Sequence, residues 1–423
     1  MDGSSNDSLK SRIRQARAKF AAMAATYCAG NLNDNFFKQS ALILAVISGK
    51  AYLQGYATIV FTLPFILFAA HAGFCADRFP KRSIVICSKM LELAAMLSAA
   101  FAVYSLNWSL MILALFILGL QATLFGPSLN GTIPELYPPQ YVPTANAIIK
   151  TATTAAILAG IASAGIVLDI KGEIGPIPLG RIVVASVMIV IALAGLAVAF
   201  AVPKFPAADP AARFPRSGPL ESVGMLYRLR KDFQLTVAII GSAFFWFVGS
   251  LQILIINQLG LTQFGLSKTL TSALIVIELS GIAAGSFLSA LLSKGGKWYR
   301  LLVPAAATMT VCMFLMAAVP YLPHLLRKPA VVTALAVLGT AGGLFLIPLA
   351  SFIQIRPAPD VKGRVIAASS FADFCGIFVS GAVLYLFNRL DVRPSDCFGL
   401  MGIMVTILAI WLFCALPKES IDA

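Results

Sequence analysis

The sequence predicts an all-α membrane protein with twelve transmembrane helices in two six-helix bundles. Hydrophobic residues make up 59% of the 423-residue chain and charged residues only 12%. Soluble domains average about 45–50% apolar and about 25% charged residues. Apolar segments of roughly the 20 residues that a bilayer crossing needs recur along the whole chain. The longest polar region, 202–233, contains five Pro and falls almost at the midpoint, as a linker between two halves would.

Charges, Pro and Gly divide the chain into the twelve predicted helices. Those of the first half cover 20–47, 52–76, 83–105, 108–128, 144–168 and 180–202. Those of the second half cover 235–259, 270–293, 301–320, 330–354, 364–387 and 396–416. The predicted domains are a basic tail over 1–19, a bundle over 20–202, a linker over 203–233, a second bundle over 234–417 and a tail over 418–423.

The distribution of Lys and Arg predicts that both chain ends lie in the cytoplasm. Of the 32 basic residues, 21 fall in the tails and loops on the side of the N-terminus, 8 on the opposite side and 3 inside spans. Cytoplasmic loops of membrane proteins carry such an excess. We therefore attribute the net charge of +14 to topology and contact with anionic lipids, and expect no nucleic-acid partner.

The seven Cys and two His do not form a ligand or disulfide pattern. The Cys lie mostly in apolar segments without a CxxC pair, and His71 and His324 are far apart in the sequence. We expect no metal site and no cofactor. Neither His has Asp five residues later, so the HxxxxD motif of acyltransferases is absent and we expect a protein that is not an enzyme.

The first predicted helix contains the polar stretch "GNLNDNFFK" (30–38). At 100° per residue, Asn31, Asp34, Asn35 and Lys38 project within about a 90° arc together with Tyr27, whereas Asn33 points elsewhere. Charge at the bilayer centre costs from about 2.5 to more than 10 kcal/mol, so this face is expected to line a cavity and bind substrate. The alternative is an Asp34–Lys38 pair that only holds helices together.

Five further polar residues inside predicted spans are candidate substrate contacts: Gln121, Lys150, Gln252, Glu278 and Asp373. Lys150 and Asp373 begin corresponding helices of the two halves, and either gate the cavity or bind substrate charge. Glu278 has no partner in its own helix, so it is a protonated buried acid, a proton carrier or a substrate contact. Lys89 and Glu92, three residues apart, are expected either to pair with each other or to join the cavity.

The loop "GFCADRFPKR" (73–82) resembles the signature loop of the major facilitator superfamily, G-x-x-x-D-R-x-G-[KR]-[KR]. It matches at Gly73, Asp77, Arg78, Lys81 and Arg82, and departs at position 80, where Pro replaces the usual Gly. The resemblance implies the major facilitator fold, with a substrate site between the halves near the midplane. We expect these five residues to form a conformational latch in which Asp77 accepts charge-assisted bonds in one conformer.

Three stretches are similar to the lysophospholipid transporter family, including the transporter domain of bifunctional acylglycerophosphoethanolamine acyltransferases. They are "NLNDNFFKQSALIL" (31–44), "FGPSLNGTIPELYPPQYVPTANAII" (125–149) and "GGLFLIPLASFIQ" (342–354) with "RVIAASS" (364–370). The resemblance implies a bacterial inner-membrane flippase that moves lysophospholipids inward for reacylation. It aligns Asp34 with the acidic residue of the family's first helix that is tied to binding of the lipid head group. The chain departs from the family at two positions: Leu129 replaces a lysine of helix 4, and Lys150 stands where an acid is common. The preferred head group therefore stays open.

The expected partners are a lysophospholipid or another amphipathic substrate, membrane lipids and a separate acyltransferase, and we expect a monomer. The alternative function is a proton-coupled exporter of a drug-like or siderophore-like molecule, with Asp34 or Glu278 as proton carrier. A non-transporting receptor or scaffold is a third class. It predicts that neutralising Asp34 leaves uptake intact.

Overall fold

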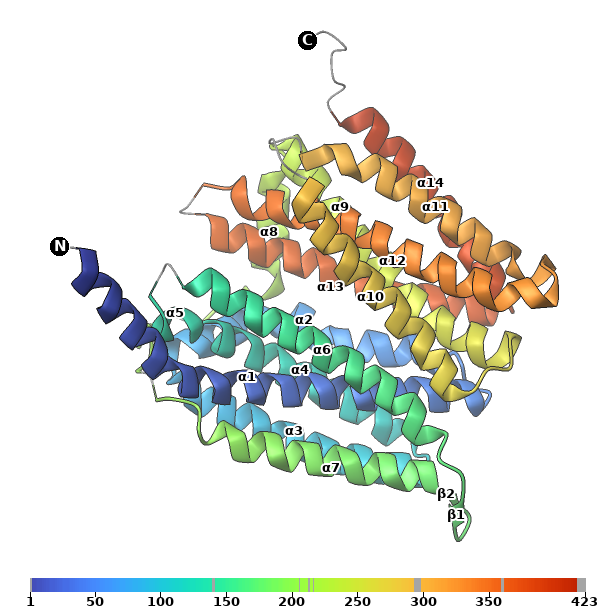
Figure 1. The fold of residues 1–423 in the computed structure, drawn as a ribbon, viewed down its shortest axis with the longest axis horizontal. Coiled ribbons are helices and arrows are strands. Elements are labelled where there is room, and N and C mark those ends of the chain that lie inside the picture. Colours follow the sequence, from blue (N-terminus) through green and yellow to red (C-terminus); the bar gives the residue numbers. More distant parts are fainter. Residues whose placement is uncertain are drawn as a thin grey trace. The chain divides into compact units, whose positions relative to one another are not determined.

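The computed structural model describes residues 2–138, 141–204, 206–211, 214–215, 217–292, 298–358 and 361–416 (Figure 1). The chain forms two compact units. The first contains the described residues of 1–44 and 60–219, and the second those of 45–59 and 220–423. The end of the first helix, the turn that follows and the start of the second helix (Ala45–Ile59) therefore belong to the second unit.

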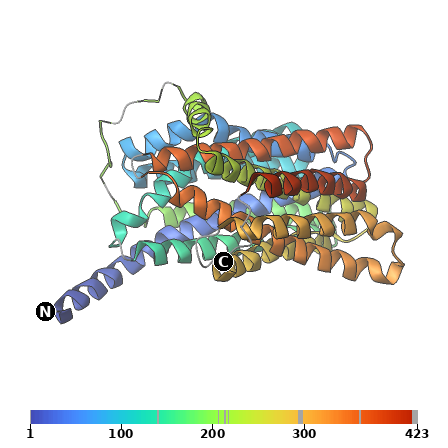
Figure 2. The same cartoon turned by 90° about the horizontal axis from the view of Figure 1, so that it is seen from above.

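Helix α1 runs without a break from Asp2 to Ile47, so the residues predicted as a tail over 1–19 are helical from Asp2 onward. No Gly or Pro interrupts the chain between Ser4 and Ala29, and Lys, Arg, Gln and Ala favour helix. The N-terminal turns of α1 project beyond the other helices of the first unit (Figure 2).

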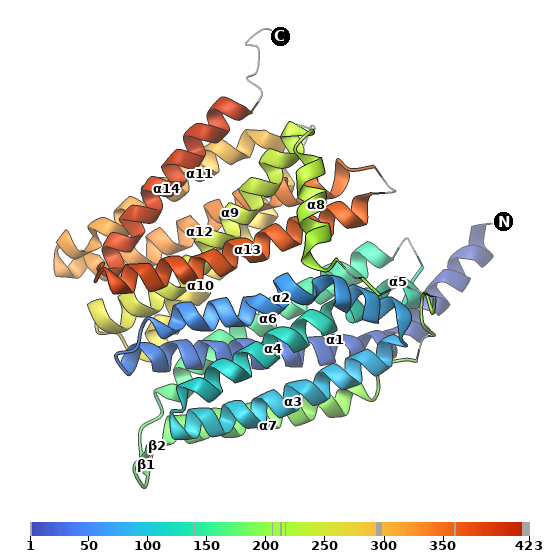
Figure 3. The ribbon, with the colours of Figure 1, turned by 180° about the vertical axis from the view of Figure 1, so that it is seen from behind.

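The first unit is completed by six further helices. They are α2 (Leu53–Arg78), α3 (Lys81–Ser105), α4 (Trp108–Asn130), α5 (Ile133–Leu136), α6 (Val142–Leu168) and α7 (Leu179–Ala199). Helix α3 packs along both α4 and α7 (Figure 3). A two-stranded hairpin, β1 (Glu173–Ile174) with β2 (Ile177–Pro178), joins α6 to α7 and is the described departure from an all-helical chain.

After the first unit, the chain forms a short helix in the polar linker, α8 (Pro219–Leu229), which the sequence did not predict. The long helices are α9 (Phe233–Gln258), α10 (Lys268–Leu292), α11 (Leu302–Ala318), α12 (His324–Ile355), α13 (Lys362–Arg389) and α14 (Pro394–Ala415). A π-helical turn η1 (Leu259–Gln263) extends α9, and 3₁₀ turns η2 (Trp298–Leu301) and η3 (Val319–Tyr321) flank α11. Helices α11 and α14 lie side by side (Figure 3).

Glycines allow α10 and α12 to pack with their backbones in contact. Gly281 and Gly285 on α10 and Gly339 and Gly343 on α12 are each four residues apart. A Cβ atom on Gly285 would lie 1.9 Å from the carbonyl oxygen of Thr340, and one on Gly339 would lie 2.0 Å from that of Glu278. This is the small-residue packing typical of membrane helices.

Eleven helices of the described chain are long and apolar enough to cross a membrane. Together with α1, whose polar stretch lowers its hydropathy, they account for the twelve predicted helices. Large apolar side chains are exposed along these helices, including Val190, Phe287 and Ile407, each more than 60% exposed. Such side chains are stable in a lipid environment, so the chain is a multi-pass membrane protein.

Candidate functional site

A pocket of about 320 Å³ opens along the polar face of α1, entirely within the first unit. Helices α2 and α4 form its other walls. The lining residues are Tyr27, Gly30, Asn31, Asp34, Asn35, Lys38, Phe61, Phe65, Gln121, Ala122, Phe125 and Gly126. All five residues that the helical projection placed on one face of α1 therefore line one pocket, and the predicted Gln121 joins them.

Asp34 and Lys38 do not form the intrahelical ion pair that their spacing allows. No ion pair joins them in the described part of the chain. The Oδ1 atom of Asp34 is buried and has no hydrogen-bond partner among the described residues, and the Lys38 ammonium lies 5.1 Å from the centre of the Phe61 ring. Both charges therefore remain available in the pocket, and the structure does not support the alternative of a purely structural pair.

The asparagines of α1 divide into two groups. Asn31 and Asn35 donate their amide N–H groups to the carbonyls of Tyr27 and Asn31, at 2.9 and 2.8 Å. One hydrogen bond of each amide nitrogen is therefore made within the helix, and neither amide oxygen accepts a hydrogen bond in the described chain. Asn33 instead donates to the Met188 carbonyl of α7 at 3.1 Å, so it joins two helices and does not line the pocket.

A buried polar cluster lies behind the pocket. Lys89 and Glu92 of α3 are fully buried and paired at 2.6 Å, and the Gln121 amide donates to the same Glu92 oxygen at 3.4 Å. A Cβ atom on Gly30 would lie 2.8 Å from the Lys89 ammonium, so the glycine makes room for this charge behind α1. Pairing was one of the two alternatives that the three-residue spacing of Lys89 and Glu92 left open; the position of the pair behind the α1 pocket was not predicted.

Glycine also determines how α6 packs on the polar helix. A Cβ atom on Gly160 would lie 2.5 Å from the carbonyl oxygen of Leu32 and 3.3 Å from the Cβ of Asn35. Helix α6 therefore packs directly against the turn of α1 that carries the pocket residue Asn35.

The other predicted contacts lie outside this pocket. Lys150 is exposed on α6. In the second unit, Gln252 of α9 and Glu278 of α10 are buried, and their Nε2 and Oε2 atoms have no partner in the described chain. Asp373 of α13 accepts a hydrogen bond from Ser242 at 2.8 Å. Their roles in substrate binding stay predictions.

Leu129, which stands where the lysophospholipid transporter family carries a lysine, belongs to an apolar cluster. It is fully buried with Phe20, Met23 and Phe125, while the Phe20 and Tyr137 rings meet edge to face at 5.3 Å. Position 129 is therefore part of the packing of α1 against α4 and α5 in this chain.

The signature loop connects several helix ends of the first unit. Lys81 donates to the Gly131 carbonyl at 3.0 Å and pairs with Glu135 of α5, and Arg82 donates to the Phe200 carbonyl at 2.6 Å. Arg78 donates to the Pro210 carbonyl at 2.6 Å.

Asp77 uses its backbone carbonyl to accept a bond from the Asp209 N–H at 2.9 Å. No hydrogen bond or ion pair of its carboxylate is found within the described ranges. The cations therefore make the side-chain contacts in this conformer, and the latch role of Gly73 and Asp77 stays a prediction.

Residues 20–381 match the sequence model of the Major Facilitator Superfamily. The chain belongs to the major facilitator superfamily. As a member it is a transporter and not an enzyme.

Two relatives and one solved structure illustrate how this facilitator compares with known proteins. It is 26% identical over 366 residues to the Lysophospholipid transporter LplT of Serratia proteamaculans, covering 83% of this chain and 85% of the relative. It is 26% identical over 383 residues to the Lysophospholipid transporter LplT of Escherichia coli O1:K1, covering 87% and 90%. The crystal structure of a D-xylose-proton symporter superimposes with a TM-score of 0.73 at 15% identity, covering 95% of this chain and 98% of the symporter. The similarity to lysophospholipid transporters agrees with the sequence motifs, and the symporter supports the fold.

Proposed function

We propose that this facilitator moves lysophospholipids with a zwitterionic head, such as lysophosphatidylethanolamine, across a bacterial inner membrane by alternating access. The observation that carries the proposal is the pair of unpaired opposite charges, Asp34 and Lys38, one helical turn apart in a single pocket. Two relatives that bear the name lysophospholipid transporter support the substrate class.

The donors and acceptors of the pocket complement such a head group. A primary ammonium has three N–H donors, and the Asp34 carboxylate with the amide oxygens of Asn31 and Asn35 offers three acceptors. Lys38 supplies the cation for the phosphate, four residues along the same face. This order of charges matches the neighbouring phosphate and ammonium of the head group.

The rest of the pocket suits the apolar part of a lipid near its head. The rings of Phe61, Phe65 and Phe125 line it beside the polar face. Ligand sites combine such apolar walls with a few placed polar groups. We further propose inward transport, cytoplasmic chain ends, a monomer and a separate acyltransferase that consumes the product.

Proteoliposomes test the proposal. Purified protein is expected to move fluorescent lysophosphatidylethanolamine between leaflets without a proton gradient, and Asp34→Asn and Lys38→Gln are expected to slow this movement. Glu221→Gln and Lys171→Gln remove the same charges at exposed positions outside the pocket and serve as matched controls.

One observation favours the alternative of a proton-coupled exporter. The Oε2 atom of Glu278 is buried and has no partner in the described chain, as a proton carrier requires. Substrate-dependent proton movement with a soluble compound, together with no lysolipid movement, would establish the exporter and exclude the flippase.

A further inference from the structure

A second pocket, of about 340 Å³, lies in the second unit where the start of α10 meets the start of α12. Its walls are mostly apolar, with Leu270, Leu274 and Ile277 on α10 and Val331 on α12. Leu270 is 51% exposed, and Leu325 and Leu326 beside the pocket are 86% and 50% exposed. These residues belong to helices that are long and apolar enough to span a membrane, so we expect the opening of this pocket to face lipid.

Two cations line the same pocket. Arg327 and Lys328 lie one turn into α12, and no acidic residue is among the described residues that line the cavity. The Arg327 Nε donates to the Leu322 carbonyl at 3.0 Å, which orients the guanidinium and leaves its other N–H groups available. The side chain of Lys328 makes no hydrogen bond or ion pair in the described chain. The pocket therefore combines an apolar wall with positive charge that no protein carboxylate neutralises.

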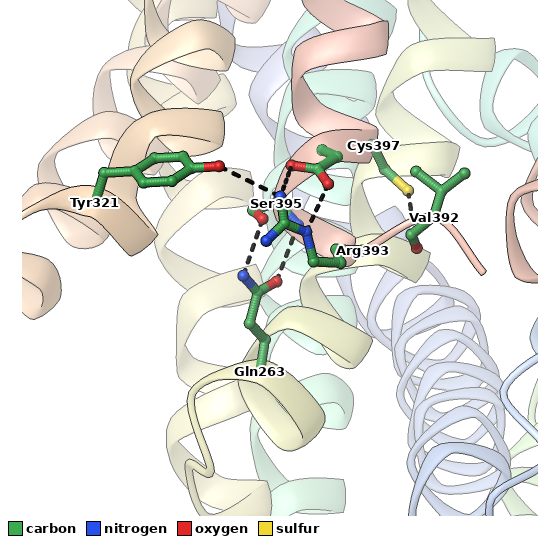
Figure 4. Close-up of polar contacts among 7 residues, drawn as sticks. Gln263, Tyr321, Val392, Arg393, Ser395 and Cys397 are labelled. Atoms are coloured by element: carbon green, nitrogen blue, oxygen red, sulfur yellow. Dashed lines mark hydrogen bonds and ion pairs between the residues drawn. The ribbon is translucent and has the colours of Figure 1, made fainter.

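A network of polar contacts holds one wall in place (Figure 4). The amide of Gln263, which lines the pocket, donates to the Ser395 hydroxyl at 2.9 Å and accepts from the Ser395 N–H at 3.0 Å. Gln263 ends the π-helical turn η1, so these bonds fix the irregular end of α9 on the first turn of α14. Nearby, Arg393 pairs with Asp396 at 2.7 Å, in contrast to Lys328.

We propose that this pocket binds one anionic glycerophospholipid of the surrounding membrane. The phosphate lies at Arg327 and Lys328, and an acyl chain follows the apolar wall of Leu270, Leu274 and Ile277. With cytoplasmic chain ends, the lipid belongs to the outer leaflet, because the starts of α10 and α12 are on the opposite side. This site is separate from the α1 pocket and does not depend on which substrate is transported.

A fluorescence experiment on the full-length protein in bilayers tests the proposal. Phe264→Trp places an indole in the pocket wall, and its quenching by lipids brominated on the acyl chains reports occupancy after subtraction of the signal of the protein's own four Trp. Brominated phosphatidylglycerol is compared with brominated phosphatidylcholine. We expect Arg327→Gln/Lys328→Gln to lower the preference for phosphatidylglycerol roughly ten- to thirtyfold, and Lys328→Gln alone about fivefold.

Two further variants separate a lipid site from surface charge. Ala273→Phe fills the pocket and is expected to lower quenching by both lipids, whereas Lys171→Gln, an exposed charge outside the pocket, leaves it unchanged. Lys328 is exposed and its side chain makes no hydrogen bond or ion pair in the described chain, so Lys328→Gln is expected to leave folding intact. Equal quenching by the two lipids in the parent, unchanged quenching in Ala273→Phe, or loss of the preference on adding inorganic phosphate would each overturn the proposal.

Discussion

Replacing Asp34 by Asn is expected to remove the preference for an ammonium-bearing head group. The change keeps the shape of the side chain and removes its charge. A hydrogen bond to a charged group contributes about 1.5–3 kcal/mol, which corresponds to roughly a 10- to 150-fold change in affinity. Because lysophosphatidylglycerol has no ammonium, its transport does not depend on this bond. The ratio of lysophosphatidylethanolamine to lysophosphatidylglycerol transport is therefore expected to fall by about that factor.

The structure also predicts the effect of this change on stability. In the described chain the Asp34 Oδ1 atom is buried without a hydrogen-bond partner and no ion pair joins Asp34 to Lys38, so neutralising Asp34 breaks no ion pair and no hydrogen bond of this atom. The midpoint of thermal unfolding in detergent is expected to stay the same or rise. The assay is uptake of both lysolipids into proteoliposomes, with the unfolding midpoint measured on the same preparations. Equal loss of transport for both lipids, or a lower midpoint, would refute a head-group role and indicate a structural one.

Three other substitutions test the packing of the helices and the contacts of the signature loop. Gly285→Ala forces α10 away from the Thr340 carbonyl and is expected to lower the thermal midpoint, whereas Gly249→Ala, which has no atom within 4 Å of the added Cβ, is its neutral control. Lys89→Met leaves the buried Glu92 carboxylate unpaired at a cost of about 3–5 kcal/mol, and adding Glu92→Gln is expected to restore most of the lost stability; an equally unstable double variant would contradict this. Lys81→Gln removes the contacts of a buried ammonium with the end of α4 and with α5. It is expected to lower the thermal midpoint and to slow transport in proteoliposomes; unchanged transport would argue against a latch.

The polar face of α1 was predictable because helical geometry alone brings residues 31, 34, 35 and 38 to one side. The same geometry excluded Asn33, which the structure places against α7. Spacing also permitted an Asp34–Lys38 pair, and here it was misleading. Whether two side chains of opposite charge meet depends on the neighbouring rings and on their rotamers, which a one-dimensional pattern does not contain.

Loop and linker conformations were less predictable. The predicted tail over 1–19 is part of α1 from Asp2 onward, and α8 forms within the linker that the Pro content marked as irregular. In both cases the local helix propensity of a few residues outweighed the overall polar composition.

The sequence by itself determined the number of long helices, the membrane environment and the polar face of α1, because hydropathy and helical periodicity are local properties. Only the tertiary structure decided that Lys89 and Glu92 lie behind that face and that Leu129 belongs to a buried apolar cluster. It also decided that Arg327 and Lys328 meet an apolar wall on α10. The physical reason is that close approach of helices depends on which glycines oppose which backbones, and this pairing connects residues far apart in the chain.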